Sequence, residues 1–207
     1  MGFRYTPEDL IRRSDFYDWY RSFPEETRQR IRQRVEGFVR ENPSFRLSLL
    51  TGPGYWVMHW LMGDLYTSLA LYLVRREEGE NPEALLAGID AELTKAGKRM
   101  NRRMRSLMKL PGAFALARRI VPGAMTLANG HGFRVTKVDC GKSGFGFHVT
   151  ECPFARLYAR YGAPEIGPVL CRFDDTLGAG FDDFEFLRRG TLCRGDDRCD
   201  FLYRKKE

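Results

Sequence analysis

The chain has 207 residues, of which 43% are apolar and 13% aromatic, and this is enough for the packed core of one large domain or two small ones. The cysteines number five, and the first residues lack an apolar signal-peptide core, so we expect no disulfide framework and predict a reduced, cytoplasmic protein. With no CxxC pair and only three histidines, a closed structural zinc site is not expected, and we predict neither a metal nor a cofactor.

The formal net charge of +7 is unevenly distributed. No acidic residue lies between Glu92 and Asp139, whereas acidic residues predominate from Asp174 to Asp200. We interpret the two regions as facing each other or a symmetry mate, which leaves a homo-oligomer open. No nucleic-acid-binding motif accompanies the basic block, so no nucleic-acid partner is predicted. The eleven basic residues of the block are Lys95, Lys98, Arg99, Arg102, Arg103, Arg105, Lys109, Arg118, Arg119, Arg134 and Lys137.

The N-terminal half is predicted to be helical. Thr6 followed by Pro7 indicates a helix start, and a second amphipathic helix is expected from about residue 24 until Asn42, which precedes a proline. The longest apolar run, residues 55–74, approaches the length of a membrane span, but Asp64 near its centre would cost about 3 kcal/mol in lipid. We therefore predict a buried central helix and no stable membrane span, with His59 and Asp64 as secondary pocket candidates.

A further helix is predicted to start near Asn81 and to continue into the basic block as far as Leu110. A short helix over residues 113–120 is expected to end at Pro122. We expect the apolar residues of this region to pack while the arginines point outward, so that the basic face is solvated; a helix that lies on a membrane surface is the alternative. Those apolar residues are Leu107, Met108, Leu110, Phe114, Leu116, Ile120, Val121 and Met125.

From Phe133 onward the pattern changes to strands. Residues 134–138 and 145–150 alternate about a turn and predict a hairpin; two helices follow, and residues 184–189 and 199–203 predict a second hairpin. The expected class is α+β: an N-terminal helical layer packed on a C-terminal four-stranded antiparallel sheet with a helix pair, in the order ββααββ. We predict a single domain over 1–207, with a helical part over 1–125, a sheet-containing part over 126–207 and a pocket between them.

Cys152 lies where the second predicted strand gives way to a helix. Proline is favoured at the first helical position, so Pro153 places Cys152 near the N-cap, beside free backbone N–H groups and the positive end of the helix dipole. This setting lowers a thiol pKa and favours a nucleophilic thiolate. The competing interpretation is a small buried side chain at a packed junction, since cysteine is among the most buried residue types.

Four segments carry a resemblance to a known family: residues 147–155 (FHVTECPFA), 170–174 (LCRFD), 187–192 (LRRGTL) and 195–201 (GDDRCDF). Together they resemble the L-2-amino-thiazoline-4-carboxylic acid hydrolase family. The resemblance implies a hydrolase that opens a small five-membered ring, a thiazoline, a hydantoin-like ring or a related cyclic amidine or amide, at a C–N bond. The end of the chain is also similar to vinyl-reductase-type domains, which implies the alternative of a non-catalytic small-ligand-binding domain.

This chemistry needs a nucleophile, a proton relay and a group that holds an anion. We predict Cys152 as the nucleophile and Asp174, which a helix places beside Cys171, as the acid or base; its competing interpretation is a solvated aspartate in a last helical turn. His148 is a further catalytic candidate, expected on the same face as Cys152 but about 13 Å away along the strand.

Substrate binding is assigned to Arg189, by bidentate pairing with a carboxylate, and to Cys171 and Cys199, the other thiols of the family pattern. Cys140 and Cys193 lie in or beside turns and receive no role. A metal-using hydrolase acting through cysteines and His148 is a third alternative.

Overall fold

The computed structural model describes residues 6–42, 53–178, 181 and 184–206. The chain forms two compact units, each made of two stretches of sequence. The helical unit contains Met1–Leu93 and Tyr158–Ile166, and the sheet unit contains Thr94–Leu157 and Gly167–Glu207.

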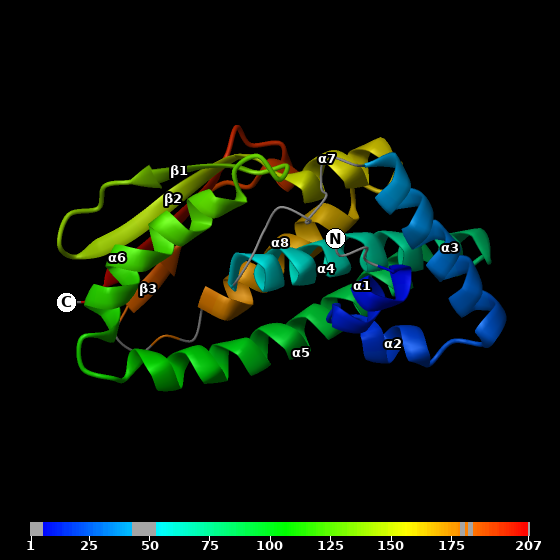
Figure 1. Cartoon of the computed structure of the whole chain (residues 1–207), viewed down its shortest axis with the longest axis horizontal. Helices are drawn as coiled ribbons and strands as arrows, with labels where there is room; N and C mark the ends of the chain where they lie inside the picture. Colours follow the sequence, from blue (N-terminus) through cyan, green and yellow to red (C-terminus); the bar gives the residue numbers. More distant parts are fainter. Residues whose placement is uncertain (1–5, 43–52, 179–180, 182–183, 207) are drawn as a thin grey trace, which may run out of the picture. The chain divides into compact units, whose positions relative to one another are not determined.

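The helical unit consists of α1 (Pro7–Arg13), α2 (Tyr17–Arg21), α3 (Glu25–Glu41), α4 (Pro53–Glu77), the first turns of α5 (Pro82–Met108) and the end of α7 (Pro153–Arg160) (Figure 1). Thr6 and Asp9 form the capping box that begins α1. At Ser14 the backbone N–H and the hydroxyl both donate to the carbonyl of Ile11, so α1 ends there and α2 begins three residues later.

The apolar run in α4 forms the centre of the helical unit, as predicted. Every residue from 62 to 74 is buried, and the close approach of α1 requires Gly63, where a Cβ atom would lie 2.6 Å from the carbonyl oxygen of Leu10. Asp64 is 4% exposed and accepts the backbone N–H of Asp15 at 2.7 Å. His59 lies in α4, but its side chain is outside the described residues. No helix in the described ranges has the length and apolar character needed to cross a bilayer.

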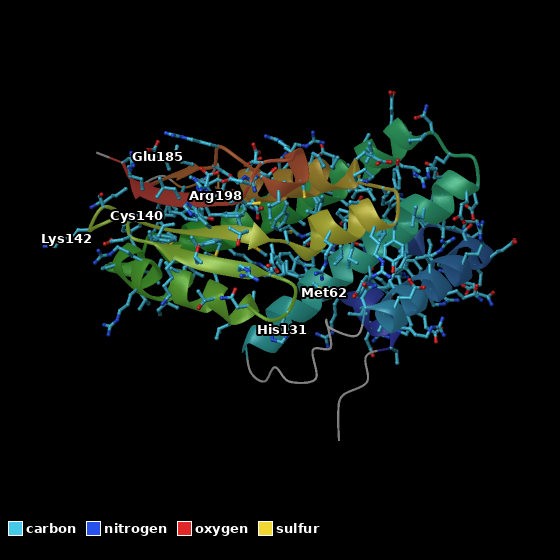
Figure 2. All side chains as sticks on the ribbon, turned by 90° about the horizontal axis from the view of Figure 1, so that it is seen from above. Met62, His131, Cys140, Lys142, Glu185 and Arg198 are labelled. Carbon is cyan, nitrogen blue, oxygen red and sulfur yellow. The ribbon has the colours of Figure 1, made fainter. Side chains whose placement is uncertain are left out.

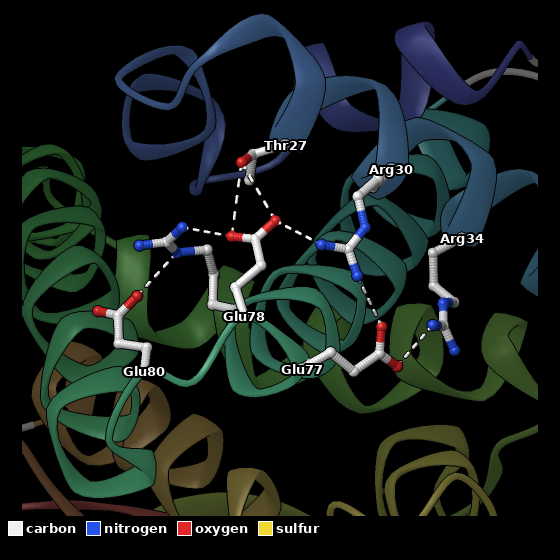
Figure 3. Close-up of polar contacts among 7 residues, drawn as sticks. Thr27, Arg30, Arg34, Glu77, Glu78 and Glu80 are labelled. Atoms are coloured by element: carbon white, nitrogen blue, oxygen red, sulfur yellow. Dashed lines mark hydrogen bonds and ion pairs between the residues drawn. The ribbon is translucent and has the colours of Figure 1, made fainter.

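A network of charged side chains joins α3 to the end of α4 (Figure 3). Arg30 donates to Glu78 at 2.7 Å and to Glu77 at 3.1 Å, and Arg34 donates to Glu77 at 2.6 Å. The hydroxyl of Thr27 also donates to Glu78. Each exposed pair contributes at most about 1 kcal/mol, so the network fixes the orientation of the two helices more than it stabilises them.

The sheet unit contains β1 (Arg134–Val138), β2 (Gly144–Glu151), β3 (Phe184–Leu187) and β4 (Cys199–Lys205), in the spatial order β1-β2-β4-β3. All neighbouring pairs are antiparallel, and α7 and α8 (Ile166–Gly178) lie between the two hairpins in sequence. The α+β class and the order ββααββ are therefore confirmed.

One face of this sheet is apolar. Phe147 stacks on Phe201 with ring centroids 4.7 Å apart, because the two residues are opposite each other in the β2–β4 register. The helix α6 (Ala113–Met125) covers this face, and the ring of Phe114 lies 5.8 Å from that of Phe145 and 5.6 Å from that of Phe184.

The second half of α5 packs on α8 within the sheet unit. A Cβ atom at Gly97 would lie 3.0 Å from the side chain of Thr176, and the side-chain amide of Asn101 donates to the carbonyl of Leu177 at 2.6 Å. The small glycine and the buried amide therefore position α8, which carries Cys171 and Asp174.

The basic block differs from the prediction in two ways. The helix α6 continues through the buried Pro122 to Met125, because Val121 and Met125 pack on the apolar face of the sheet and offset the hydrogen bond that proline removes. Four side chains expected to pack are exposed instead: Leu107, Leu110, Leu116 and Ile120.

Candidate active site

Four of the five cysteines lie together in the sheet unit and form what we call the thiol cluster: Cys152, Cys171, Cys193 and Cys199. They come from the junction of β2 and α7, from the middle of α8, from the 3-10 helix Leu192–Arg194 and from the first residue of β4. All are free thiols. From the sequence we predicted roles for three of them but none for Cys193. This residue reaches the thiol cluster because the loop between β3 and β4 folds into a helical turn.

Cys152 caps α7 as predicted. The strand β2 ends at Glu151 and α7 begins at Pro153, and the sulfur of Cys152 accepts the backbone N–H groups of Ala155 and Phe154. Burial nevertheless raises the pKa of the Cys152 thiol to about 12, with the two N–H groups acting in the opposite direction. The expected lowering of its pKa is therefore wrong. Desolvation of the charged thiolate outweighs the helix terminus.

Cys171 and Cys193 form a hydrogen-bonded pair of thiols. The S–H of Cys193 donates to the sulfur of Cys171, which lowers the pKa of Cys171 and raises that of Cys193. Thr191 is 1% exposed, and its buried hydroxyl has no hydrogen-bond partner among the described residues. Cys171 is thus the member of the thiol cluster whose surroundings favour the thiolate.

Arg188, the residue directly after β3, binds to the middle and second half of α8. Its side chain is 3% exposed and donates to the carbonyl of Cys171 at 2.6 Å, to Asp174 at 2.8 Å and to Asp175 at 2.7 Å. The guanidinium lies over the ring of Phe201, 5.4 Å from its centroid. This buried arginine therefore fixes the carboxylates beside Cys171.

Asp174 has the titration of a group that can both give and take a proton near neutral pH. Burial raises its pKa to about 6, and the guanidinium of Arg188 acts in the opposite direction. Its side chain is 37% exposed, so the carboxyl group exchanges protons with solvent while it remains paired. The predicted proximity of Asp174 to Cys171 on α8 agrees with their electrostatic interaction.

Cys199 is the most buried of the four thiols, at 6% exposed. Its sulfur accepts the backbone N–H of Leu192 at 3.3 Å, and burial raises its pKa to about 11. It packs in the apolar cluster of Val135, Phe147 and Val149. Cys199 is therefore a neutral, buried thiol within the thiol cluster.

The structure separates His148 from the thiols. Phe147 and Val149 face the cluster that Cys152 joins, and the alternation of a strand puts His148 on the opposite face. The expectation that His148 and Cys152 share a face is wrong, because β2 ends at Glu151 and Cys152, no longer part of the strand, packs with Phe147 and Val149. In the β2–β4 register His148 lies opposite Asp200.

Arg189 also lies outside the thiol cluster. Its side chain is exposed, and its backbone N–H, with that of Gly190, donates to the carboxylate of Asp200. The buried arginine is instead Arg188. The alternation of Phe184 and Phe186 on the apolar face continues to Arg188 and is the sequence signal that could have identified it.

The described residues contain no group of three or more His, Cys, Asp or Glu side chains arranged to hold a metal ion. The sheet unit has a hollow of about 720 Å³, but α6 and the turn between β1 and β2 line it, at Arg118, Arg119, Lys137 and Cys140 among others. The fifth cysteine, Cys140, therefore belongs to a different surface from the thiol cluster.

One comparison with known proteins identifies the family. The family model of L-2-amino-thiazoline-4-carboxylic acid hydrolase matches residues 61–203. The chain belongs to this family. The match includes the thiol cluster, Asp174 and Arg188, so the hydrolase family and the site geometry concern the same residues. Membership supports a small-molecule hydrolase. No curated protein matches the chain.

Proposed function

We propose that this member of the hydrolase family opens a five-membered heterocycle at a C–N bond through a cysteine thiolate. Suitable substrates are thiazolines, hydantoin-like rings and related cyclic amidines or amides. The observation that carries the proposal is the pair of Cys171 and Cys193 beside Asp174, held by the buried Arg188. In this proposal Cys171 is the nucleophile, Cys193 the thiol that donates a hydrogen bond to it, and Asp174 the acid.

Cys171 is the nucleophile in this proposal. Its thiolate adds to the ring carbon between the heteroatoms, a C–S bond forms, and the ring C–N bond breaks as a proton reaches the leaving nitrogen. Water then attacks the same carbon, and the bond between this carbon and the Cys171 sulfur breaks. The overall reaction consumes one water and regenerates the thiolate. Cys193 donates its S–H to the Cys171 sulfur, which favours the thiolate before attack.

Asp174 supplies the proton in the proposed reaction. With a pKa of about 6 it is partly protonated near neutral pH, and its interaction with Cys171 places it beside the nucleophile. After ring opening the carboxylate accepts a proton from the attacking water. Arg188 positions Asp174 throughout, because it bonds to Asp175 and to the carbonyl of Cys171 as well.

Cys152, the nucleophile predicted from the sequence, takes a different part here. With a pKa of about 12 it remains a thiol at neutral pH, capped by the N–H groups of α7. A neutral S–H in this position is a hydrogen-bond donor to a substrate oxygen or nitrogen. His148 lies on the other face of the sheet, and the proposal assigns it no step.

A mass-spectrometric screen tests the proposal. The purified protein is incubated with thiazolines, hydantoins and cyclic ureas, and a product heavier than its substrate by one water identifies turnover. Cys171→Ser is expected to abolish turnover, while Cys140→Ser serves as the matched control because Cys140 lies outside the thiol cluster. Binding of a ring compound without any turnover, measured by calorimetry, would favour the non-catalytic ligand-binding alternative.

A further inference from the structure

The exposed apolar side chains of the described residues are concentrated in one short stretch of the sheet unit. Those large hydrophobic residues that are exposed all lie between positions 107 and 127. Scattered exposed leucines need no explanation, but a concentration of this kind marks an interaction surface. The five residues are Leu107, Leu110, Leu116, Ile120 and Leu127, which are between 52% and 62% exposed.

The helix α6 is apolar on two sides. One side packs on the sheet through Phe114, Val121 and Met125. The other side carries Leu116 and Ile120, four residues apart and therefore on one face of the helix, and both are exposed. A helix of a soluble domain normally has one apolar face, so the second face of α6 is available to a partner.

The charge of the same stretch indicates the kind of partner. Residues 93–138 hold eleven basic residues and no acidic one, whereas the rest of the chain holds 23 basic and 27 acidic residues. The side chains of Arg102, Arg103 and Arg119 are exposed. Exposed apolar side chains and exposed arginines thus occur in the same segment.

A hollow whose lining holds more basic than acidic residues lies between α6 and the β1–β2 turn. It has a volume of about 720 Å³, and its charged lining residues are Arg118, Arg119, Lys137 and Asp139. Arg118 donates to the carbonyl of Gly141 at 3.0 Å, which holds the guanidinium at the wall of this hollow. Figure 2 shows Cys140 and Lys142 at this turn, at one end of the sheet. An anionic head group of phosphate size fits such a site.

We propose that the second half of α5, α6 and the following 3-10 helix (Thr126–Ala128) form a docking surface for an anionic lipid bilayer. The exposed leucines and Ile120 enter the boundary between head groups and acyl chains, and the exposed Arg102, Arg103 and Arg119 bind the lipid phosphates. The protein lies on the bilayer and does not span it.

Charge decides between this partner and two others. A symmetric dimer through the same surface would bring two basic segments together, and like charges oppose such an interface. A nucleic acid would pair with the basic residues, but it offers no apolar surface for Leu116 and Ile120 to enter. An anionic bilayer supplies both the negative charge and the apolar interior.

Vesicle flotation tests the docking surface. The full chain is expected to float with vesicles of phosphatidylcholine containing about one third phosphatidylserine, not with phosphatidylcholine alone, and to dissociate as sodium chloride is raised. Leu116→Ser with Ile120→Ser, and separately Arg103→Gln with Arg119→Gln, are each expected to weaken binding about tenfold or more. Circular dichroism confirms that the variants, which change exposed residues only, remain folded.

The matched control is Arg12→Gln with Arg40→Gln, which removes the same charge from exposed residues of the helical unit. It is expected to bind the anionic vesicles as the natural sequence does. Absence of binding to anionic vesicles, or equal loss in the control, overturns the proposal. A dimer in sedimentation experiments without lipid that Leu116→Ser with Ile120→Ser dissociates would overturn it too, because the surface would then bind a second copy.

Discussion

The helical unit and the sheet unit place their polar and apolar groups in different ways. In the helical unit, the described large apolar side chains are covered, and the charged residues at the end of α4 pair with those of α3 (Figure 3). In the sheet unit, all five cysteines and every exposed leucine or isoleucine of the described residues are present. The helical unit therefore has its apolar and charged groups engaged within the fold, whereas the sheet unit carries the groups available for chemistry and binding.

The contrast is sharpest between two aspartates. Asp64 of the helical unit is 4% exposed, accepts one backbone N–H, and burial raises its pKa well above the ordinary value. Asp174 of the sheet unit is 37% exposed, is paired with Arg188, and has a pKa of about 6. Burial thus raises the pKa of the first, which holds a turn, whereas the second has a pKa of about 6, in the range where enzymes work.

The largest expected effect concerns the proposed nucleophile. Cys171→Ser is expected to lower kcat/KM about a thousandfold or more, because the serine hydroxyl does not ionise near neutral pH and is a much weaker nucleophile than the thiolate. Cys140→Ser is expected to change it less than about twofold. Rates are measured with whichever ring compound the screen identifies. If Cys152→Ser removes turnover and Cys171→Ser does not, the roles of the two thiols are reversed.

The next effect belongs to the helical unit and concerns stability. Asp64→Ala removes the acceptor of the Asp15 N–H and leaves a void in a buried site, so we expect a loss of about 2–3 kcal/mol in the free energy of unfolding. Asp64→Asn keeps an acceptor oxygen and is expected to cost about 1 kcal/mol or less at low pH. Urea unfolding measures both variants.

The pH dependence of the same site has a definite sign. Because the pKa of Asp64 is higher in the folded chain than in the unfolded one, its contribution to stability is complete below the unfolded pKa and is lost as pH rises through the folded pKa. Asp64→Asn is therefore expected to gain stability relative to the natural sequence as pH rises above the ordinary aspartate pKa of about 4. A difference in stability that does not change with pH would contradict a raised pKa for Asp64.

Asp174→Asn is expected to have an intermediate effect, on the pH profile of turnover. If Asp174 gives its proton to the leaving nitrogen, activity falls as pH rises through about 6, the pKa of this group. The asparagine variant is expected to be about tenfold to a hundredfold slower and to lack this limb. Arg188 still pairs with Asp175 in the variant, so circular dichroism should show an intact sheet unit. An unchanged limb would assign the titration to another group.

The elements of the fold could be predicted because they depend on local pattern. Alternation identified both hairpins, and Thr6, Asn42 and Pro153 marked helix ends that the structure has at or next to those residues. The thiol cluster could be predicted only in part. Cys193 joins it through the fold of a loop, and Cys152 has a raised pKa because of burial, which a sequence does not display. The exposed face of α6 was missed because composition alone cannot show which of two apolar faces packs.

The pairing of thiols predicts an alkylation pattern. Cys171 is expected to react with iodoacetamide at lower pH than Cys152, since its environment lowers its pKa and burial raises that of Cys152. Cys193→Ala removes the hydrogen bond and should move the alkylation of Cys171 to higher pH. Peptide mapping after timed labelling separates the sites. Reaction of Cys152 before Cys171 at neutral pH would favour Cys152, at the start of α7, as the nucleophile.

The smallest effect is expected at Arg189, and it separates two adjacent arginines. Arg189→Gln changes an exposed side chain, so the free energy of unfolding should change by less than about 0.5 kcal/mol. The KM should change by less than about twofold. Arg188→Gln removes a buried guanidinium from Asp174, Asp175 and the Cys171 carbonyl, and we expect it to destabilise the chain by about 3 kcal/mol and to shift the pKa of Asp174 upward. A larger effect of Arg189→Gln than of Arg188→Gln would mean that the strand alternation places Arg189, and not Arg188, against α8.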